Sequence, residues 1–285
     1  MRGPSGVCQW AVKRAGLGGH DRGVAAEIVP TERAGAFVLR MDGHDQSLVD
    51  LDDPGRLDFD YVRRIGDVLD SWGVPGAPAR VLHVGGAALT LPRYVAHTRP
   101  RSAQVVLEPN VEVTELVRRE LPLPPRSGIK VRPVDGRAGL LAFRDDALDL
   151  IVVDAFADGR VPGDLVTVEC AAAYARVLVA DGLLLINLVD AAPFAWTRRV
   201  VAAMRTALPT QLVSAEPATL RARRPGNLLL VAGRPTVPAD ALRKRAVSSP
   251  TPYRVLDETA LRDSLGRGVP FVDADTLDSP GLDSP

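Results

Sequence analysis

The stretch Arg80-Val-Leu-His-Val-Gly-Gly-Ala-Ala-Leu-Thr-Leu-Pro92 decides the fold of this chain. Its apolar run breaks at Gly85-Gly86, and a segment compatible with a helix follows. A strand, a tight turn and a helix in this order open a nucleotide-binding α/β unit. The glycines permit the turn, and they let a ligand lie close to main-chain N–H groups at the start of the helix.

An acidic residue ends the next apolar run, Val105-Val-Leu-Glu-Pro109. At that place the Glu108 carboxylate can accept hydrogen bonds from both hydroxyls of a ribose. The pair of motifs therefore favours an adenosine-type ligand. The alternative is an ordinary βαβ turn with a glutamate on the surface.

Composition excludes several classes of protein. The 285 residues hold 35 basic and 35 acidic side chains, so no net charge draws the chain to nucleic acid or to a membrane. Cys8 and Cys170 are too few for a disulfide framework or a metal cluster, and we expect no metal site. Neither a signal peptide nor an apolar run of about 18 residues is present. We expect a cytoplasmic protein without nucleic-acid or membrane partners.

The chain divides into four predicted parts. Residues 1–23 form a disordered tail, and residues 24–78 form a small antiparallel β element followed by a helix over 57–72. Residues 79–235 form a Rossmann-like nucleoside-binding domain. Residues 236–285 form a partly disordered C-terminal extension with short helices over 239–246 and 259–265. Disorder is expected from Asp273 onward, where Asp-Ser-Pro repeats.

Strands and helices alternate within the nucleoside-binding domain. Leu148-Asp-Leu-Ile-Val-Val153 and Leu183-Leu-Leu-Ile186 are nearly continuous apolar runs, as in parallel strands covered on both faces. The fold class is therefore α/β, with a doubly wound, mostly parallel seven-stranded sheet. The strands are predicted at 80–84, 104–108, 129–134, 148–153, 182–187, 210–215 and 227–232. The helices are predicted near 89–98, 110–120, 136–142, 166–179 and 193–207.

Ligands of such sheets lie beyond the carboxyl ends of the strands, where Gly85, Glu108, Asp135 and Asp154 all fall. Asp135, before Gly136, can accept from the exocyclic amine of adenine or cap the helix that follows, and the two roles are compatible. Asp154 can accept a proton or hold an amine for attack on an electrophilic carbon. Its alternative role is simple loop capping.

Other polar residues are assigned to the core or to solvent. His83 lies inside a predicted buried strand and Cys170 in an apolar helix, so we expect both to be packed rather than reactive. Asp158 shares the loop of Asp154 and is expected to be solvated.

The chain resembles the spermidine synthase, or polyamine aminopropyltransferase, family within the class I S-adenosylmethionine-dependent methyltransferase fold. The resemblance covers about residues 24–235. The motifs that carry it are Met41-Asp-Gly-His-Asp-Gln46, Leu57-Asp-Phe-Asp-Tyr61, Val84-Gly-Gly-Ala87, Leu107-Glu108, Val134-Asp135-Gly136, Val152-Val-Asp154 and Gly226-Asn-Leu-Leu-Leu-Val231.

The resemblance implies a transferase of polyamine biosynthesis that moves an aminopropyl group from decarboxylated S-adenosylmethionine to putrescine or a related amine. It implies that Asp154 is the acid/base residue, and that Tyr61 and Asp158 contact the amine. It also implies assembly through the N-terminal element into a dimer or tetramer, of which a homodimer is one form. The residues that would hold the nucleoside donor are Gln46, Gly85, Gly86, Glu108, Asp135 and Gly136.

The chain departs from the family pattern at the amine site. The family's glycine loop continues Gly-Gly-Gly-Asp-Gly, whereas Ala87-Ala88-Leu89 stands here. Val62 and Arg63 replace a His and a Glu, and Ala157 replaces a second acid. An arginine at position 63 would repel an amine if it faced the pocket. Two alternatives therefore stay open: a methyltransferase that uses intact S-adenosylmethionine, and a non-catalytic protein that retains the fold.

Overall fold

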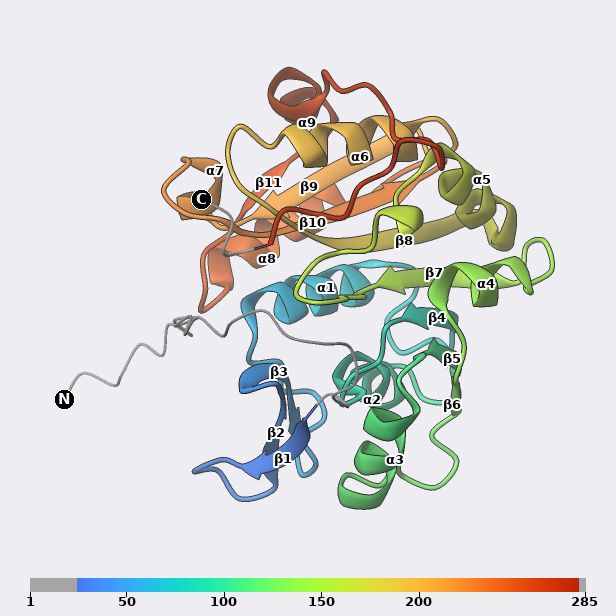
Figure 1. The fold of residues 1–285 in the computed structure, drawn as a ribbon, viewed down its shortest axis with the longest axis vertical. Coiled ribbons are helices and arrows are strands. Elements are labelled where there is room, and N and C mark those ends of the chain that lie inside the picture. Colours follow the sequence, from blue (N-terminus) through green and yellow to red (C-terminus); the bar gives the residue numbers. More distant parts are fainter. Residues whose placement is uncertain (1–24, 282–285) are drawn as a thin grey trace, which may run out of the picture.

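The computed structural model describes residues 25–281, which form a large mixed sheet covered by helices and a separate small sheet (Figure 1). The predicted disordered tail over residues 1–23 lies outside the described residues. The prediction of an α/β fold with a doubly wound, mostly parallel sheet and a small antiparallel element is confirmed.

The large sheet has eight strands in the order β11-β9-β10-β8-β7-β4-β5-β6. Neighbours from β6 to β8 run parallel, whereas β10 is antiparallel to β8 and β9, and β11 is antiparallel to β9. The predicted count of seven strands is therefore one short, because β11 lies in the C-terminal extension. The strands are β4 (Arg80–Val84), β5 (Ala103–Leu107), β6 (Ile129–Arg132), β7 (Leu148–Val153), β8 (Leu178–Asp190), β9 (Thr210–Ala215), β10 (Gly226–Gly233) and β11 (Arg254–Leu256).

Side chains that alternate along the central strands form a separate core on each face of the large sheet. Leu82 and Ile151 belong to the core that includes residues of α5 and α6. Val81 and Leu150 belong to the core that includes residues of α1 and α2. The helices are α1 (Asp60–Ser71), α2 (Thr90–Thr98), α3 (Val111–Glu120), α4 (Gly136–Leu141), α5 (Val168–Val177), α6 (Ala195–Arg205), α7 (Pro217–Leu220), α8 (Ala239–Ser248) and α9 (Glu258–Leu265).

The small sheet consists of β1 (Ala26–Pro30), β2 (Ala36–Met41) and β3 (His44–Asp50), paired antiparallel in sequence order. Leu39 and Val49 on its inner face are buried with Ala88 and Leu89 of the glycine loop. The Thr90 hydroxyl also donates to the Leu48 carbonyl oxygen at 2.9 Å. The small sheet thus packs directly on the loop that begins α2.

The prediction of disorder from Asp273 onward is wrong for residues 273–281. This segment is hydrogen-bonded to residues far away in the sequence, and the side chain of Ser279 is fully buried. A composition rich in Asp, Ser and Pro signals a lack of apolar surface, but here polar contacts with the folded domain hold the chain. Within residues 25–281, no helix combines the length and apolar character needed to cross a membrane.

Candidate functional site

A cavity of about 1560 Å³ opens at the carboxyl ends of β4, β5 and β7. It is bounded by the small sheet, the glycine loop, the start of α1 and the loop after β7. The structure brings together all nine residues that the sequence predicted for the site; their roles in binding and catalysis stay predictions. They are Gln46, Tyr61, Gly85, Gly86, Glu108, Asp135, Gly136, Asp154 and Asp158.

The glycine loop approaches Asp154 through its backbone. Gly85 has φ +85°, and a Cβ there would lie 2.4 Å from the Asp154 carbonyl oxygen, so only glycine fits. Ala87 and Leu89 also have positive φ, at 40° and 65°. Two residues of the loop that carry side chains therefore adopt the left-handed backbone conformation. This conformation costs about 1 kcal/mol for each such residue.

Glu108 is held in place by amides of the glycine loop. Its Oε2 accepts from Gly86 N at 3.0 Å and from Ala87 N at 3.3 Å, and its Oε1 accepts from Asn110 N at 3.0 Å. An ionised carboxylate has about four acceptor positions, so about one is left for a ligand hydroxyl, and a second hydroxyl would have to share a position with one of these amides.

Asp135 is the N-cap of α4, because its Oδ1 accepts from Ala138 N at 3.0 Å. The capping alternative is thus confirmed. The residue is exposed at the cavity, so the capping role leaves its second carboxylate oxygen compatible with a ligand contact.

Asp154 is half-buried at the end of β7, and an amide holds its carboxylate. Its Oδ1 accepts from Asn187 Nδ2 at 2.9 Å, and Asn187 Oδ1 accepts from Asn227 Nδ2 at 3.1 Å. Burial raises the pKa of Asp154 from 3.8 to about 6, while the Asn187 hydrogen bond acts in the opposite direction. A carboxylate with this pKa is suited to exchange protons near neutral pH.

Asn187 and Asn227 were not singled out from the sequence. Asn187 is 1% exposed and stands alone in the apolar run of β8. The sequence does contain a signal for Asn187, because a single amide side chain inside a buried apolar strand needs a hydrogen-bond partner.

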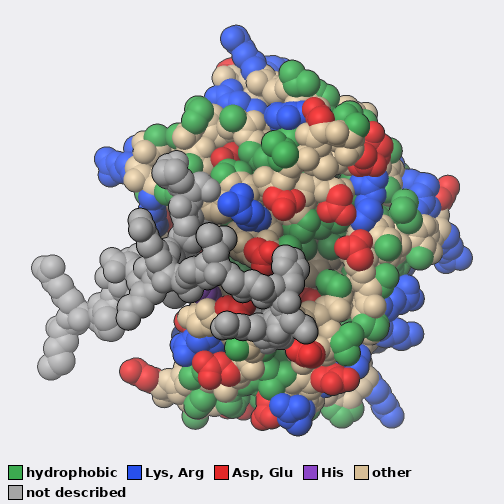
Figure 2. Space-filling model, in the orientation of Figure 1, with side chains coloured by type: hydrophobic (Ala, Val, Ile, Leu, Met, Phe, Trp, Pro, Cys, Tyr) green, Lys and Arg blue, Asp and Glu red, His purple; other side chains and the backbone are tan. Residues whose placement is uncertain are grey.

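Carboxylates outnumber cations in the cavity wall, and Figure 2 shows acidic side chains around the middle of this face. Of the four arginines that line it, Arg40 pairs with Asp45 at 2.9 Å and Arg224 pairs with Glu216. Arg64 is buried and donates to backbone carbonyls, one of them at 2.6 Å, and the fourth, Arg160, is exposed and donates to the Ser279 carbonyl at 3.2 Å. The acidic residues of the wall are Asp42, Asp45, Asp58, Asp60, Glu108, Asp135, Asp154, Asp158 and Glu216.

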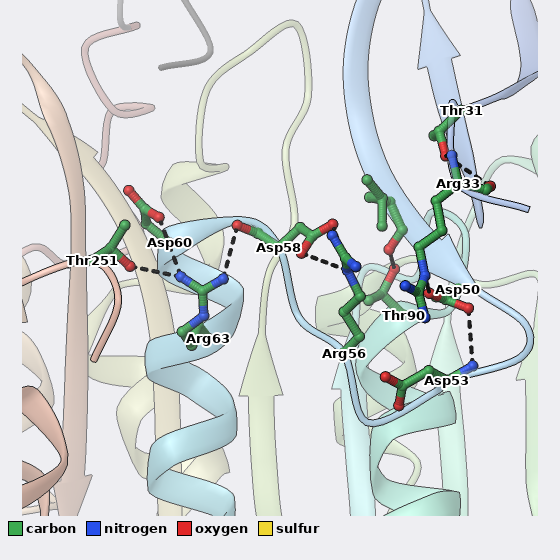
Figure 3. A network of polar contacts seen from close by, with 11 residues as sticks. Thr31, Arg33, Asp50, Asp53, Arg56, Asp58, Asp60, Arg63, Thr90 and Thr251 are labelled. Atoms are coloured by element: carbon green, nitrogen blue, oxygen red, sulfur yellow. Dashed lines mark hydrogen bonds and ion pairs between the residues drawn. The ribbon is translucent and has the colours of Figure 1, made fainter. Parts of the chain in front are cut away.

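Arg63 does not line the cavity. Its guanidinium donates to Thr251 Oγ1 at 2.7 Å and lies 3.7 Å from the Asp60 carboxylate, as Figure 3 shows. The guanidinium is therefore turned towards Thr251 and Asp60, and the Asp60 carboxylate offsets part of its charge.

Two other reactive side chains are packed as predicted. The buried His83 shares a hydrogen bond of 2.9 Å with Gln104 Oε1, and burial lowers the pKa of His83 to about 4. Cys170 is buried in α5, and burial raises the pKa of its thiol to about 11. Among residues 25–281, no group of three or more His, Cys, Asp or Glu side chains is arranged to hold a metal ion.

Comparison with solved structures identifies the fold class of the chain. The chain superposes on human methyltransferase-like protein 13 in complex with SAH with a TM-score of 0.54, at 19% identity over 68% of this chain and 94% of that one. The order of the parallel strands and the cavity at their carboxyl ends agree with this likeness. The chain therefore has the class I methyltransferase fold.

Within that fold the chain is similar to spermidine synthases. A probable spermidine synthase from Corynebacterium glutamicum superposes with a TM-score of 0.81, at 25% identity over 93% of this chain and 100% of that one. A spermidine synthase in complex with the transition-state analogue AdoDATO superposes with a TM-score of 0.55. The two sequences are 17% identical, and the match covers 87% of this chain and 84% of that one. No protein-family model matches the chain, and no curated protein matches it. The resemblance drawn from the motifs is confirmed, and these neighbours are transferases.

Proposed function

We propose that the protein transfers an aminopropyl group from decarboxylated S-adenosylmethionine to putrescine or a related small amine. The observation that carries this proposal is Asp154, a half-buried carboxylate that lines a cavity in which acidic residues outnumber basic ones. Such a wall attracts a protonated amine and disfavours an anionic acceptor. The acidic residues also supply partners for the ammonium of the donor, in the absence of a carboxylate at Ala88.

The donor would lie across the glycine loop. In this proposal Glu108 receives the ribose hydroxyls, while Asp135 and Gly136 adjoin the adenine. Gln46, from the small sheet, closes over the nucleoside, and Gly85 and Gly86 admit it to close backbone contact. The neighbours bound to SAH and AdoDATO support a ligand of this kind.

The reaction needs a neutral amine aligned with one carbon atom. The amine nitrogen attacks the methylene carbon next to the sulfonium, a C–N bond forms, and the C–S bond breaks with its electron pair left on sulfur. The proton that the amine loses passes to the ionised carboxylate of Asp154. Positioning and proton acceptance supply the rate enhancement without a covalent intermediate.

The amide of Asn187 is expected to set the pH range of this activity. Because the hydrogen bond from Asn187 stabilises the charged form of Asp154, Asn187→Leu would raise the pKa of that carboxyl above its present value of about 6. The acid limb of the kcat/KM profile would start near pH 6 in the wild type and move to higher pH in the variant. If the acid limb of the kcat/KM profile stayed at the same pH and only the plateau value of kcat/KM fell, the result would contradict this expectation.

A second candidate function is methyl transfer from intact S-adenosylmethionine. The specific observation is Ala88, which is buried in an apolar cluster and does not line the cavity. A donor that retains its carboxylate does not require an acidic residue in this loop.

Calorimetric titration of four nucleosides separates the candidates. They are decarboxylated S-adenosylmethionine, methylthioadenosine, S-adenosylmethionine and S-adenosylhomocysteine. Tighter binding of the first two supports aminopropyl transfer, and tighter binding of the last two supports methyl transfer. Binding of none would favour a non-catalytic protein that retains the fold.

A further inference from the structure

The segment from Asp273 to Gly281, here called the C-terminal strap, crosses the domain beside α5 and α6 (Figure 1). Its last described residue, Gly281, lines the cavity. The strap therefore contributes to the cavity wall from the far end of the chain.

Ion pairs and hydrogen bonds anchor the first half of the strap. Asp273 lies between Arg137, at 3.0 Å, and the Thr167 hydroxyl, at 2.6 Å. Asp275 pairs with Arg199 at 2.5 Å. These contacts fix the strap to helices that belong to the core of the domain.

The second half of the strap is bonded to the loop that follows Asp154. Val161 N donates to Ser279 Oγ at 2.8 Å, and Ser279 N donates to the Val161 carbonyl at 3.0 Å. Gly163 N donates to Asp278 Oδ1 at 2.9 Å, and the Thr276 hydroxyl donates to the Gly163 carbonyl at 2.7 Å. Each backbone N–H and C=O of Val161 and Gly163 thus has a partner in the strap.

The tip of this loop, residues 157–160, has little support of its own, whereas Val161 and Gly163 at its base are buried. Ala157 and Arg160 exchange two backbone hydrogen bonds, and Asp158 and Gly159 between them both have positive φ, as in a type I′ turn. All four residues are exposed, and all four line the cavity. An exposed turn with few buried contacts takes its position from the segment that anchors it.

We propose that the C-terminal strap fixes the loop 157–163 against the cavity and thereby limits the size of the acceptor that reaches Asp154. Because the loop follows Asp154 directly, a loop that moves outward widens the acceptor side of the cavity. The inference that the loop limits the size of the acceptor rests on the proposed function. The inference that the strap fixes the loop is independent of that function.

The test uses the full chain with Thr276→Val, Asp278→Ala and Ser279→Ala combined. These changes remove three side-chain bonds to the loop and leave the anchors at Asp273 and Asp275 in place. Asp275→Ala is the matched control, because it breaks an anchor without touching the loop. Circular dichroism confirms that each variant is folded.

Hydrogen–deuterium exchange of residues 157–163 is expected to become at least about tenfold faster in the triple variant and to change little in the control. Equal exchange in the triple variant and the wild type overturns the proposal.

Transfer to putrescine and to N-butylputrescine then measures acceptor size. The triple variant is expected to raise the ratio of kcat/KM for the bulkier amine to that for putrescine by about tenfold. An unchanged ratio with faster exchange overturns the acceptor role. Absence of transfer by the wild type overturns that role together with the proposed function, and the exchange experiment then reports on the strap alone.

Discussion

Asp154→Asn is expected to lower kcat for transfer by about a thousandfold, the usual scale of a lost general base. The asparagine keeps the size of the side chain and an oxygen that can accept from Asn187, but it cannot take a proton from the amine. Nucleoside affinity should stay within about twofold, because Glu108 and the glycine loop are untouched. Product formation followed by chromatography and titration of the nucleoside measure the two effects.

Asp158→Asn is the comparison variant, because it removes the neighbouring charge of the same loop; Asp158 is predicted to contact the amine, so a rise in KM is expected rather than a loss of kcat. Wild-type turnover by Asp154→Asn would show that Asp154 is not the base. Equal losses in both variants would point to the charge of the loop rather than to proton transfer at one carboxylate.

The same substitution has a second expected effect, on stability. The pKa of Asp154 is about 6 in the folded protein against an ordinary value of 3.8, so ionisation favours the unfolded chain. The wild type therefore loses stability as the pH rises through about 6, and Asp154→Asn does not. Chemical denaturation should find the variant more stable by about 1–2 kcal/mol at pH 8, with the difference shrinking towards pH 4.

Glu108→Gln is expected to weaken nucleoside binding by about a hundredfold, because hydrogen bonds from ribose hydroxyls to a carboxylate are worth more than those to an amide. Titration of the preferred nucleoside measures the loss. Free adenine serves as an internal reference, because it has no ribose. Glu112→Gln, on the exposed first turn of α3, is the matched control.

A parallel loss of adenine binding would contradict this role of Glu108. It would mean that the substitution had released the amides of Gly86 and Ala87 and collapsed the loop. Unchanged nucleoside affinity would remove Glu108 from the binding site altogether.

Local sequence patterns were sufficient to predict the centre of the fold. β4 and β7 were predicted with their observed bounds, because continuous apolar runs that end in glycine or aspartate mark buried parallel strands. β11 was missed because it has only three residues and forms by pairing with the distant β9. The ordered conformation of residues 273–281 could not be predicted for the same physical reason, because the residues that hydrogen-bond to this segment are far away in the sequence.

In the candidate site, too, features set by local sequence could be predicted, whereas features set by contacts between distant residues could not. Carboxylates at strand ends, such as Glu108 and Asp154, could be predicted because parallel topology brings strand ends to one edge. The direction of Arg63 could not, because Thr251, from a distant part of the chain, takes up its guanidinium. The Asn227–Asn187–Asp154 chain crosses three strands whose order only the folded sheet defines.

The burial of Ala88 restricts which side chains position 88 can hold. The residue is enclosed by Leu39 and Val49 of the small sheet, so a new aspartate there would be a desolvated charge in an apolar cluster. A single substitution to aspartate at position 88 is therefore expected to destabilise the fold. Accommodating the charge would also require changes in the small sheet, because Leu39 and Val49 belong to the same apolar cluster.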